Sequence, residues 1–278
     1  MQFQIHDEFS ELRDVVVCLG TSVVPYAKYV AGEPEFTKYH KRTWDKDLLL
    51  RQQEAFFKRL EHYNVTLHFP QTSPDLPWQM YTRDIGFVIH HRLYFSTKRQ
   101  FSERRGEADE LLAMLKKDGF PDASELTTGS IEGGDVVVAP DLAFVGNGSR
   151  TEEAAIAELS TKETCDRLFL GDNVMHLDTR FTILPKNHAL IVPTAFKPND
   201  LARLKKRFTL LPVFEEETLD LATNVFLVNP ETIFSAKHNR RINAMLINAG
   251  FHLEELNYTE PINLGGSFRC TTLPLVRG

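Results

Sequence analysis

Apolar and polar positions alternate along the chain in a pattern that recurs several times. Four stretches contain an apolar run, a turn-like tip and a second apolar run, which is typical of β-hairpins. They are RDIGFVIHHRLYFST, GGDVVVAPDLAFVGN, LDTRFTILPKNHALIVP and TNVFLVNPETIFSA. A fifth stretch, RCTTLPLVRG, has one apolar run, and the isolated N-terminal run LRDVVVCLG could be its partner. The pattern therefore predicts five related units.

A helix and a short strand are predicted between successive hairpins. Apolar residues at three- and four-residue spacing indicate helices at 46–62, 103–118, 151–163, 199–207 and 239–249. The short strands that follow them are VTLHF, SELTT, RLFLG, TLLPV and HLEEL. The residues that open the five units, Asp84, Asp135, Asp178, Asn224 and Cys270, are 51, 43, 46 and 46 residues apart. A period in this range is typical of repeated supersecondary units.

Short, weakly similar units favour a closed ring over an open solenoid, because closure removes the exposed sheet edges. We therefore predict an α/β fold of five units in which the N-terminal strand completes the last unit. Equivalent strand ends converge on the axis of such a ring, so residues far apart in the sequence can meet in one site. No linker or change of composition divides the chain, and residues 1–278 are interpreted as a single domain.

Composition and charge narrow the function classes. The 278 residues are 42% hydrophobic and carry a net charge of -6, which argues against a general nucleic-acid binder. No apolar run has the length of a membrane span, and the charged start MQFQIHDEFSELRD does not resemble a signal peptide. Cys18, Cys165 and Cys270 are too widely spaced for a disulfide framework or a paired-cysteine metal site. We expect a cytoplasmic, reduced protein without nucleic-acid or membrane partners; a homo-oligomer stays open.

Four short motifs contain the residues with candidate chemistry. YTRD contains Asp84, IEGGD contains Glu132, MHLDT contains His176 and Asp178, and NLGGSFRC contains Cys270. Taken singly, each residue has an ordinary structural explanation, such as a surface ion pair, a turn cap, a satisfied buried histidine or a small buried cysteine. A metal site of His176, Asp178 and Glu132 is conceivable, but no HExxH or paired-cysteine spacing supports it.

Together, the order and spacing of these motifs resemble those of the guanidino-group-modifying enzymes, the pentein superfamily, from about residue 12 to the end of the chain. The superfamily includes arginine deiminases, dimethylarginine dimethylaminohydrolases, agmatine deiminases and amidinotransferases. The resemblance implies a five-bladed, pseudo-symmetric α/β propeller, which agrees with the repeat. It also implies that Cys270 is the nucleophile, that His176 transfers protons, and that Glu132 orients the histidine and the substrate. Asp84 and Asp178 match the carboxylates that hold the substrate guanidinium.

The implied chemistry needs neither a metal nor an organic cofactor. A bound guanidinium favours the thiolate form of Cys270, because the two opposite charges lie side by side. The thiolate attacks the central carbon, and His176 protonates the departing amine. His176 then activates the water that hydrolyses the covalent thiouronium. The expected partner is a small-molecule guanidino substrate.

Other residues give conflicting indications about which substrate the protein binds. The chain length and the segments SERRGE and GNGSRTEEA resemble those of dimethylarginine dimethylaminohydrolases. In that family the residues at the positions of Arg104 and Arg150 bind the substrate carboxylate. Solvated arginines at helix starts would explain these two residues equally well. Asp178 of HLDT is instead typical of arginine and agmatine deiminases and favours an unmethylated guanidinium. Trp78 stands where family members often have Asp or Asn. The arginine of the deiminases' RGGGHC ending is absent, with Gly265 near its place.

We therefore predict a cysteine-dependent hydrolase of the guanidino group of arginine or a related carboxylate-bearing compound. The ending NLGGSFRC also resembles that of amidinotransferases, which pass the amidino group to an amine. Those enzymes usually lack the Glu of EGGD, and its presence here as Glu132 favours hydrolysis. A non-catalytic, ribosome-binding pentein is a third alternative, against which the complete Cys–His–carboxylate set argues.

Overall fold

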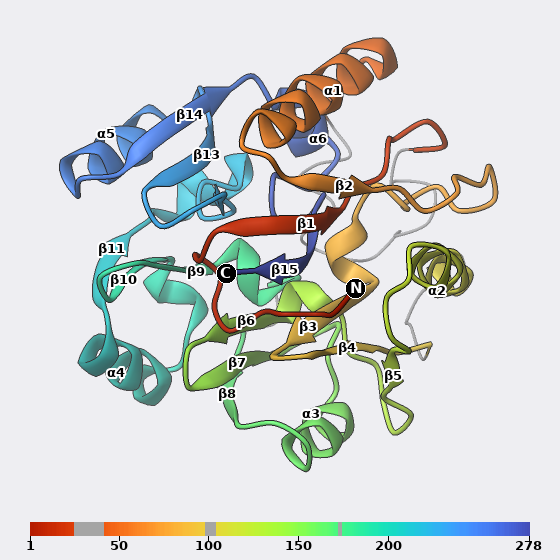
Figure 1. The fold of residues 1–278 in the computed structure, drawn as a ribbon. Coiled ribbons are helices and arrows are strands. Elements are labelled where there is room, and N and C mark those ends of the chain that lie inside the picture. Colours follow the sequence, from red (N-terminus) through yellow and green to blue (C-terminus); the bar gives the residue numbers. More distant parts are fainter. Residues whose placement is uncertain (25–41, 98–103, 172–173) are drawn as a thin grey trace.

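The strands of this chain form small sheets of one common plan arranged around an axis (Figure 1). The computed structural model describes residues 1–24, 42–97, 104–171 and 174–278. Within these ranges there are five sheets of three strands each. In every sheet the central strand pairs antiparallel with one neighbour and parallel with the other, which follows it after a helix. The predicted α/β ring of five units is confirmed.

The first three sheets each consist of a hairpin, a helix and a returning strand. They contain β3 (Gly86–Ile89), β4 (Arg92–Phe95), α2 (Glu107–Lys117) and β5 (Ser124–Glu125); β6 (Val136–Ala139), β7 (Leu142–Asn147), α3 (Glu153–Ser160) and β8 (Cys165–Phe169); and β9 (Phe181–Leu184), β10 (His188–Ile191), α4 (Pro198–Arg207) and β11 (Thr209–Pro212).

The last two sheets follow the same plan, and the fifth combines both ends of the chain. The fourth contains β12 (Phe226–Leu227), β13 (Thr232–Ala236), α5 (Arg240–Asn248) and β14 (His252–Leu256). The fifth contains β15 (Leu273–Arg277), β1 (Leu12–Val16), α1 (Lys46–His62) and β2 (Thr66–His68). Here β15 pairs antiparallel with β1, with Leu273 opposite Val16. The N-terminal run therefore is the missing partner of the last apolar run, as predicted.

Some predicted elements differ from the structure at their ends. Helix α2 begins at Glu107 instead of residue 103, which lies outside the described residues, and α3 is shorter than the predicted 151–163. A further helix, α6 (Thr259–Asn263), had no counterpart in the prediction. In contrast, α1 has the predicted bounds, because the Asp45 side chain caps it by accepting a hydrogen bond from Leu48 N at 2.7 Å. Among the described helices, none combines the length and apolarity needed to cross a bilayer.

Helices α1 to α5 lie on the outside of the ring (Figure 1). Apolar side chains fill the space between neighbouring units. Phe56 of α1 is fully buried and joins units four and five. Its ring lies 5.0 to 6.3 Å, centroid to centroid, from four aromatic rings, those of Phe226, Phe234, Tyr258 and Phe268. Offset and edge-to-face aromatic contacts of this kind stabilise a core beyond the area they bury.

A buried histidine ties the closing sheet to α2. His68 of β2 has Nε2 2.9 Å from Asp14 Oδ1 in β1 and Nδ1 2.7 Å from Asp118 Oδ2 at the end of α2. Burial alone would lower the pKa of His68, but the hydrogen bonds to Asp14 and Asp118 raise it above its ordinary value. The protonated histidine can donate to both carboxylates at once.

We expect this histidine to make stability depend on pH. Its contribution is fully present below the ordinary histidine pKa of about 6.5 and is lost as the pH rises through the raised pKa of the folded state. At low pH the free energy of unfolding of His68→Gln should be about 1–3 kcal/mol below that of the wild type. As the pH rises, the free energy of unfolding of the variant should fall less than that of the wild type. Urea unfolding of both proteins across this range measures the difference. Parallel pH profiles for the two proteins would contradict the assignment.

Candidate functional site

The turns that lead into the five hairpin-forming strands meet near the axis of the ring. Each turn has a polar residue or the cysteine at the position that opens its unit in the sequence. In the first three units these turns are short 3₁₀ helices, Thr82–Asp84, Gly133–Asp135 and Leu177–Thr179. The equivalent residues of the last two units, Asn224 and Cys270, precede β12 and β15. The structure thus brings Asp84, Asp178 and Cys270 together from three different units.

Hydrogen bonds connect neighbouring turns. Asp135 Oδ1 accepts from Leu177 N at 2.9 Å, and Asn224 Nδ2 donates to the Asp178 carbonyl at 3.2 Å. The ring is closed by Arg83 N, which donates to the Cys270 carbonyl at 3.2 Å. Since each bond joins consecutive units, the positions of the reactive side chains are set by the ring as a whole.

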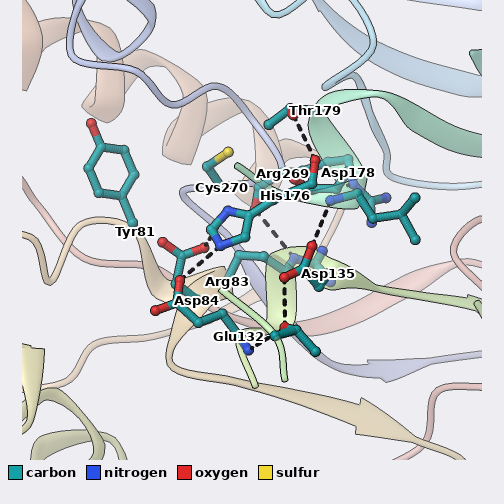
Figure 2. Close-up of polar contacts among 12 residues, drawn as sticks. Tyr81, Arg83, Asp84, Glu132, Asp135, His176, Asp178, Thr179, Arg269 and Cys270 are labelled. Atoms are coloured by element: carbon teal, nitrogen blue, oxygen red, sulfur yellow. Dashed lines mark hydrogen bonds and ion pairs between the residues drawn. The ribbon is translucent and has the colours of Figure 1, made fainter. Parts of the chain in front are cut away.

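His176 lies between two carboxylates at the centre of this cluster (Figure 2). Its Nε2 is 2.8 Å from Glu132 Oε2, and its Nδ1 is 3.6 Å from Asp84 Oδ1. Burial alone would lower the pKa of His176, but the negative charge of Asp84 and the hydrogen bond to Glu132 raise it to about 10. The imidazole is therefore protonated at neutral pH and can act as a general acid.

The EGGD motif lets the backbone pass directly against this imidazole. A Cβ atom on Gly134 would lie 2.7 Å from the His176 ring, which is too close for any other residue without displacement of the ring. A Cβ atom on Gly133 would lie 2.2 Å from the carbonyl oxygen of Arg83 in the first unit. The glycine pair therefore allows three consecutive units to approach one another at the site.

Arg104 contacts the carboxylate of Asp84 rather than open space. Its Nη1 donates to Asp84 Oδ2 at 2.7 Å, and its Nε lies 2.9 Å from Glu107 Oε2. Arg104 and Glu107 are both buried, with 2% and 0% exposure. A substrate carboxylate that bound Arg104 would have to compete with these two acidic side chains.

Asp178 is fully buried and has unused hydrogen-bonding capacity. Within the described residues, neither of its carboxylate oxygens has a hydrogen-bond partner, and the nearest cation is Arg269, whose Nε is 3.6 Å from Oδ2. Burial raises the pKa of Asp178, and the positive charges of Arg269 and His176 oppose this effect. A carboxylate in this state can accept N–H groups from a planar cation.

Cys270 is 3% exposed and sits among these carboxylates. Burial raises the pKa of its thiol well above the ordinary value, and the negative charges of Asp178 and Asp84 add to the increase. Its Sγ lies 3.5 Å from Asn224 Oδ1, which also accepts from Arg269 N at 3.0 Å. The free protein therefore holds a neutral thiol in a field that attracts cations.

Two further residues concern the substrate end of the site. They are Arg150, a predicted carboxylate binder, and Trp78, which stands where family members often have Asp or Asn. Arg150 is buried, and it precedes Thr151, whose Oγ1 donates to Asp135 Oδ2 at 2.6 Å. Trp78 is fully buried in an apolar cluster that includes Cys270. The other buried members of that cluster are Val23, Leu49, Met80, Tyr81, Met175 and Leu264.

Acidic residues and a histidine in one place could also contribute ligands to a metal ion. Asp84, Glu132 and His176 each offer an atom within 4.8 Å of the others. In the structure these groups face one another and Arg104, so a metal ion would replace hydrogen bonds and ion pairs that already exist. Asp178, a member of the metal site that the sequence made conceivable but did not support, is not part of this group in the described residues.

The structure adds residues that sequence reasoning did not assign to the site. Asn224 contacts both Arg269 N and the Cys270 thiol, and its place in the repeat was a signal that could have identified it. Asp135 holds the backbone next to His176, and burial raises its pKa to about 7 against the opposing charge of His176. Arg269 lies in the NLGGSFRC motif, but sequence reasoning assigned it no role, because its contacts depend on the ring.

Comparisons with known proteins agree with this geometry. Residues 58–210 match the family model described as arginine deiminase. The chain is 36% identical to the uncharacterized protein YkgA of Bacillus subtilis (strain 168), over 82% of this chain and 80% of that protein. It is 23% identical to the N(G),N(G)-dimethylarginine dimethylaminohydrolase of Pseudomonas aeruginosa, over 87% of this chain and 90% of that protein.

A solved structure shows the same fold. The N-terminal domain of ArgZ, a cyanobacterial arginine dihydrolase crystallised with its product, superposes with a TM-score of 0.84 at 22% identity. The superposition covers 96% of this chain and 98% of that domain. The fold is therefore the five-bladed α/β propeller of the penteins.

The charge of His176 can be tested in the free protein. Its ring should be protonated at neutral pH and lose its proton only near pH 10, because two carboxylates flank it. The ring-proton resonance of His176, followed by NMR as the pH is raised, measures this titration. In Glu132→Gln the midpoint should move to lower pH, since one of the two negative charges is removed. A midpoint near the ordinary histidine value in the wild type would contradict the geometry.

Proposed function

The chain belongs to the arginine deiminase family, and from this premise we propose that it hydrolyses the guanidino group of arginine or a related carboxylate-bearing compound. One observation carries the proposal. Five residues from four units, Asp84, Glu132, His176, Asp178 and Cys270, form a single buried cluster with a thiol, a protonated imidazole and three carboxylates. This is the set of groups that cleavage of a guanidinium C–N bond requires.

Electrostatics supports binding of a guanidinium in this cluster. The three buried carboxylates face one imidazolium, Arg104 and Arg269, and Asp178 still has two acceptor oxygens without hydrogen bonds in the described part of the chain. A planar cation that donates two N–H groups to one carboxylate forms a short, charge-assisted pair. In a site shielded from water such a pair is stronger than in solution.

The same cation would activate the nucleophile. The carboxylates and burial keep the Cys270 thiol protonated in the free protein, and a guanidinium beside the sulfur offsets that effect. The thiol proton leaves to solvent, and the thiolate forms an S–C bond to the central carbon. The protonated His176 then donates its proton to the departing nitrogen as the C–N bond breaks. The products of this half are a free amine or ammonia and a covalent thiouronium.

The second half of the reaction returns the enzyme to its starting state. Neutral His176 takes a proton from water as the oxygen bonds to the thiouronium carbon. The S–C bond then breaks, and the sulfur leaves as thiolate. The hydroxyl proton released as the ureido C=O forms passes to the thiolate, which restores the neutral thiol beside protonated His176, and the ureido product dissociates. Glu132 and Asp84 stabilise the imidazolium that forms, which the two short contacts to its ring nitrogens support. No step needs a metal or an organic cofactor.

Side chains around the cluster bear on the choice of substrate. Asp178 favours an unmethylated guanidinium, because methyl groups would remove the N–H donors that it can accept. Arg104 and Arg150 are the two candidates for binding a substrate carboxylate, and Arg104 also contacts Asp84 and Glu107. Trp78 packs in the apolar cluster with Cys270 and would restrict the other side of the site.

A screen of guanidino compounds tests the proposal directly. Arginine, methylated arginines, agmatine and carboxylate-bearing guanidines should be assayed for release of ammonia and of alkylamines. Each assay is run with and without an amine acceptor. Hydrolysis requires a ureido product in the absence of the acceptor. Turnover that occurs only with the acceptor would establish amidino transfer instead.

Cys270→Ser should abolish turnover, because an alcohol at its ordinary pKa is a much weaker nucleophile than a thiolate. Binding should largely persist, since the carboxylates remain. Acid quench of the wild type during turnover should give a mass adduct on the peptide that contains Cys270. Cys18→Ser is the matched control for a second buried cysteine and should retain turnover. An adduct on Cys18 or Cys165 would refute the assignment.

Arg150→Ala should raise KM for a carboxylate-bearing substrate with little change in kcat, because the contact is made equally in the ground and transition states. Loss of one charge-assisted hydrogen bond, about 1.5–3 kcal/mol, corresponds to roughly a tenfold to hundredfold change. The KM for agmatine, which lacks the carboxylate, serves as the internal control and should not change. Arg104→Ala provides the comparison: because Arg104 holds Asp84, its removal should weaken both substrates. An unchanged KM for arginine in Arg150→Ala would exclude Arg150 from carboxylate binding.

A further inference from the structure

The N-terminal arm, residues 1–11, lies across the centre of the ring near the C-terminal strand (Figure 1). It contacts several units at once. Gln4 N donates to Leu275 O at 3.0 Å, and Ile5 and His90 exchange backbone hydrogen bonds at 2.8 and 2.7 Å. Glu8 Oε1 accepts from Val138 N at 3.2 Å in the second unit. The arm is therefore a fixed part of the ring rather than a loose extension.

Glu8 is the most deeply buried charged residue of this arm, and it pairs with Arg269, the residue before Cys270. It is 2% exposed and lies among three buried arginines, Arg83, Arg269 and Arg277. Arg269 Nη1 donates to Glu8 Oε2 at 3.1 Å, and Arg83 Nη1 is 4.0 Å from Glu8 Oε1. Burial alone would raise the pKa of Glu8, but Arg269, Arg83 and Arg277 lower it to about 2. Glu8 is thus ionised at any pH at which the protein functions.

Arg269 connects Glu8 to the reactive cluster. One side of its guanidinium contacts Glu8 through Nη1, and its Nε faces Asp178 Oδ2 at 3.6 Å. The backbone N–H of Arg269 is fixed by Asn224 Oδ1 at 3.0 Å, and its carbonyl accepts from Arg83 Nε at 3.4 Å. Side chain and backbone are therefore both held immediately before Cys270. This juxtaposition of Glu8, Arg269 and Asp178 has no counterpart in the motifs that identify the site.

We propose that Arg269 is a positioning residue that orients Asp178 and keeps it ionised for the substrate guanidinium, and that Glu8 of the N-terminal arm holds Arg269 in this role. The proposal rests on the proposed function, in which Asp178 binds the guanidinium. Asp178 has no hydrogen bond to either oxygen in the described residues, and its carboxylate forms an ion pair with Arg269 at 3.6 Å. A protonated Asp178 would carry no charge with which to attract a cation.

Charge balance explains why both partners are needed. Arg269 stabilises the Asp178 carboxylate, but alone it would cancel the charge that the substrate meets. Glu8 lies against Arg269 and also against Arg83 and Arg277, so it offsets part of the positive charge that this side of the site would otherwise present. The other charged groups that face Asp178 are His176, Arg83 and Asp84. Those that face the Cys270 thiol include Asp178, Asp84, Arg269 and Arg83.

Two substitutions should shift the same titrations in opposite directions. Arg269→Met preserves much of the side-chain volume and removes the positive charge, so the acid limb of kcat/KM and the titration of the Cys270 thiol should move to higher pH. Glu8→Gln leaves the arginines uncompensated, so both should move to lower pH. Each variant should lose on the order of tenfold in kcat/KM near neutral pH, mainly through KM. Arg269→Lys, which keeps the charge, should restore part of the loss.

The thiol titration is read from the ultraviolet absorbance of the Cys270 thiolate, after subtraction of the same protein carrying Cys270→Ala. Glu11→Gln is the matched control, because Glu11 lies in the same arm but is exposed and pairs with Arg13. Its profiles should equal those of the wild type. Circular dichroism and urea unfolding of every variant separate an altered site from an unfolded protein.

The two proposals can fail separately. A wild type that hydrolyses none of the guanidino compounds would remove the proposed function, while the thiol titrations would still report on Arg269 and Glu8. Folded Arg269→Met and Glu8→Gln proteins whose thiol and kcat/KM profiles match the wild type would overturn the positioning role. If Arg269→Met does not fold, Glu8→Gln decides alone, and a shift to higher pH or no shift overturns the proposal.

Discussion

Closure of the ring through the antiparallel pairing of β1 with β15 is the constraint on which the site depends. The last unit has only one strand of its own hairpin, and β1 supplies the other. This pairing fixes the chain just after Cys270 against the first part of the sequence. The contact of Arg83 N with the Cys270 carbonyl then joins the fifth unit to the first. A thiol from the last unit and a carboxylate from the first can therefore act on one substrate.

Burial of many charges in one place is the second feature that organises the molecule. Carboxylates and cations alternate from the arm to the site, from Glu8 through Arg269 to Asp178, and from Glu132 through His176 and Asp84 to Arg104. Charges removed from water are tolerated when they are paired and hydrogen bonded. The exceptions are Asp178, which lacks hydrogen bonds to its carboxylate in the described residues, and the neutral thiol of Cys270. Both are states that a bound guanidinium would change.

The local pattern predicted the secondary structure well where it repeated strongly. Alternating apolar runs and turn-like tips located the hairpins, and three- and four-residue spacing located the helices, with α1 correct at both ends. Helix ends that depend on capping or on tertiary contacts were less accurate, as in α3, and α6 was missed. The motifs located Asp84, Glu132, His176, Asp178 and Cys270, which the structure places in one cluster. Their catalytic and binding roles stay predictions.

The sequence by itself determined the number of units, their order and the five side chains with candidate chemistry, because hydrophobic periodicity and short motifs are local properties. Only the tertiary structure decided which charges face one another. It placed Arg104 on Asp84 and Glu107, Asn224 against Cys270, and Glu8 of the arm against Arg269. Tertiary contacts also decide the protonated state of His176, through Asp84 and Glu132, and the neutral state of the Cys270 thiol, through burial, Asp178 and Asp84. The physical reason is that burial and electrostatic interaction depend on distances between units, which no local pattern specifies.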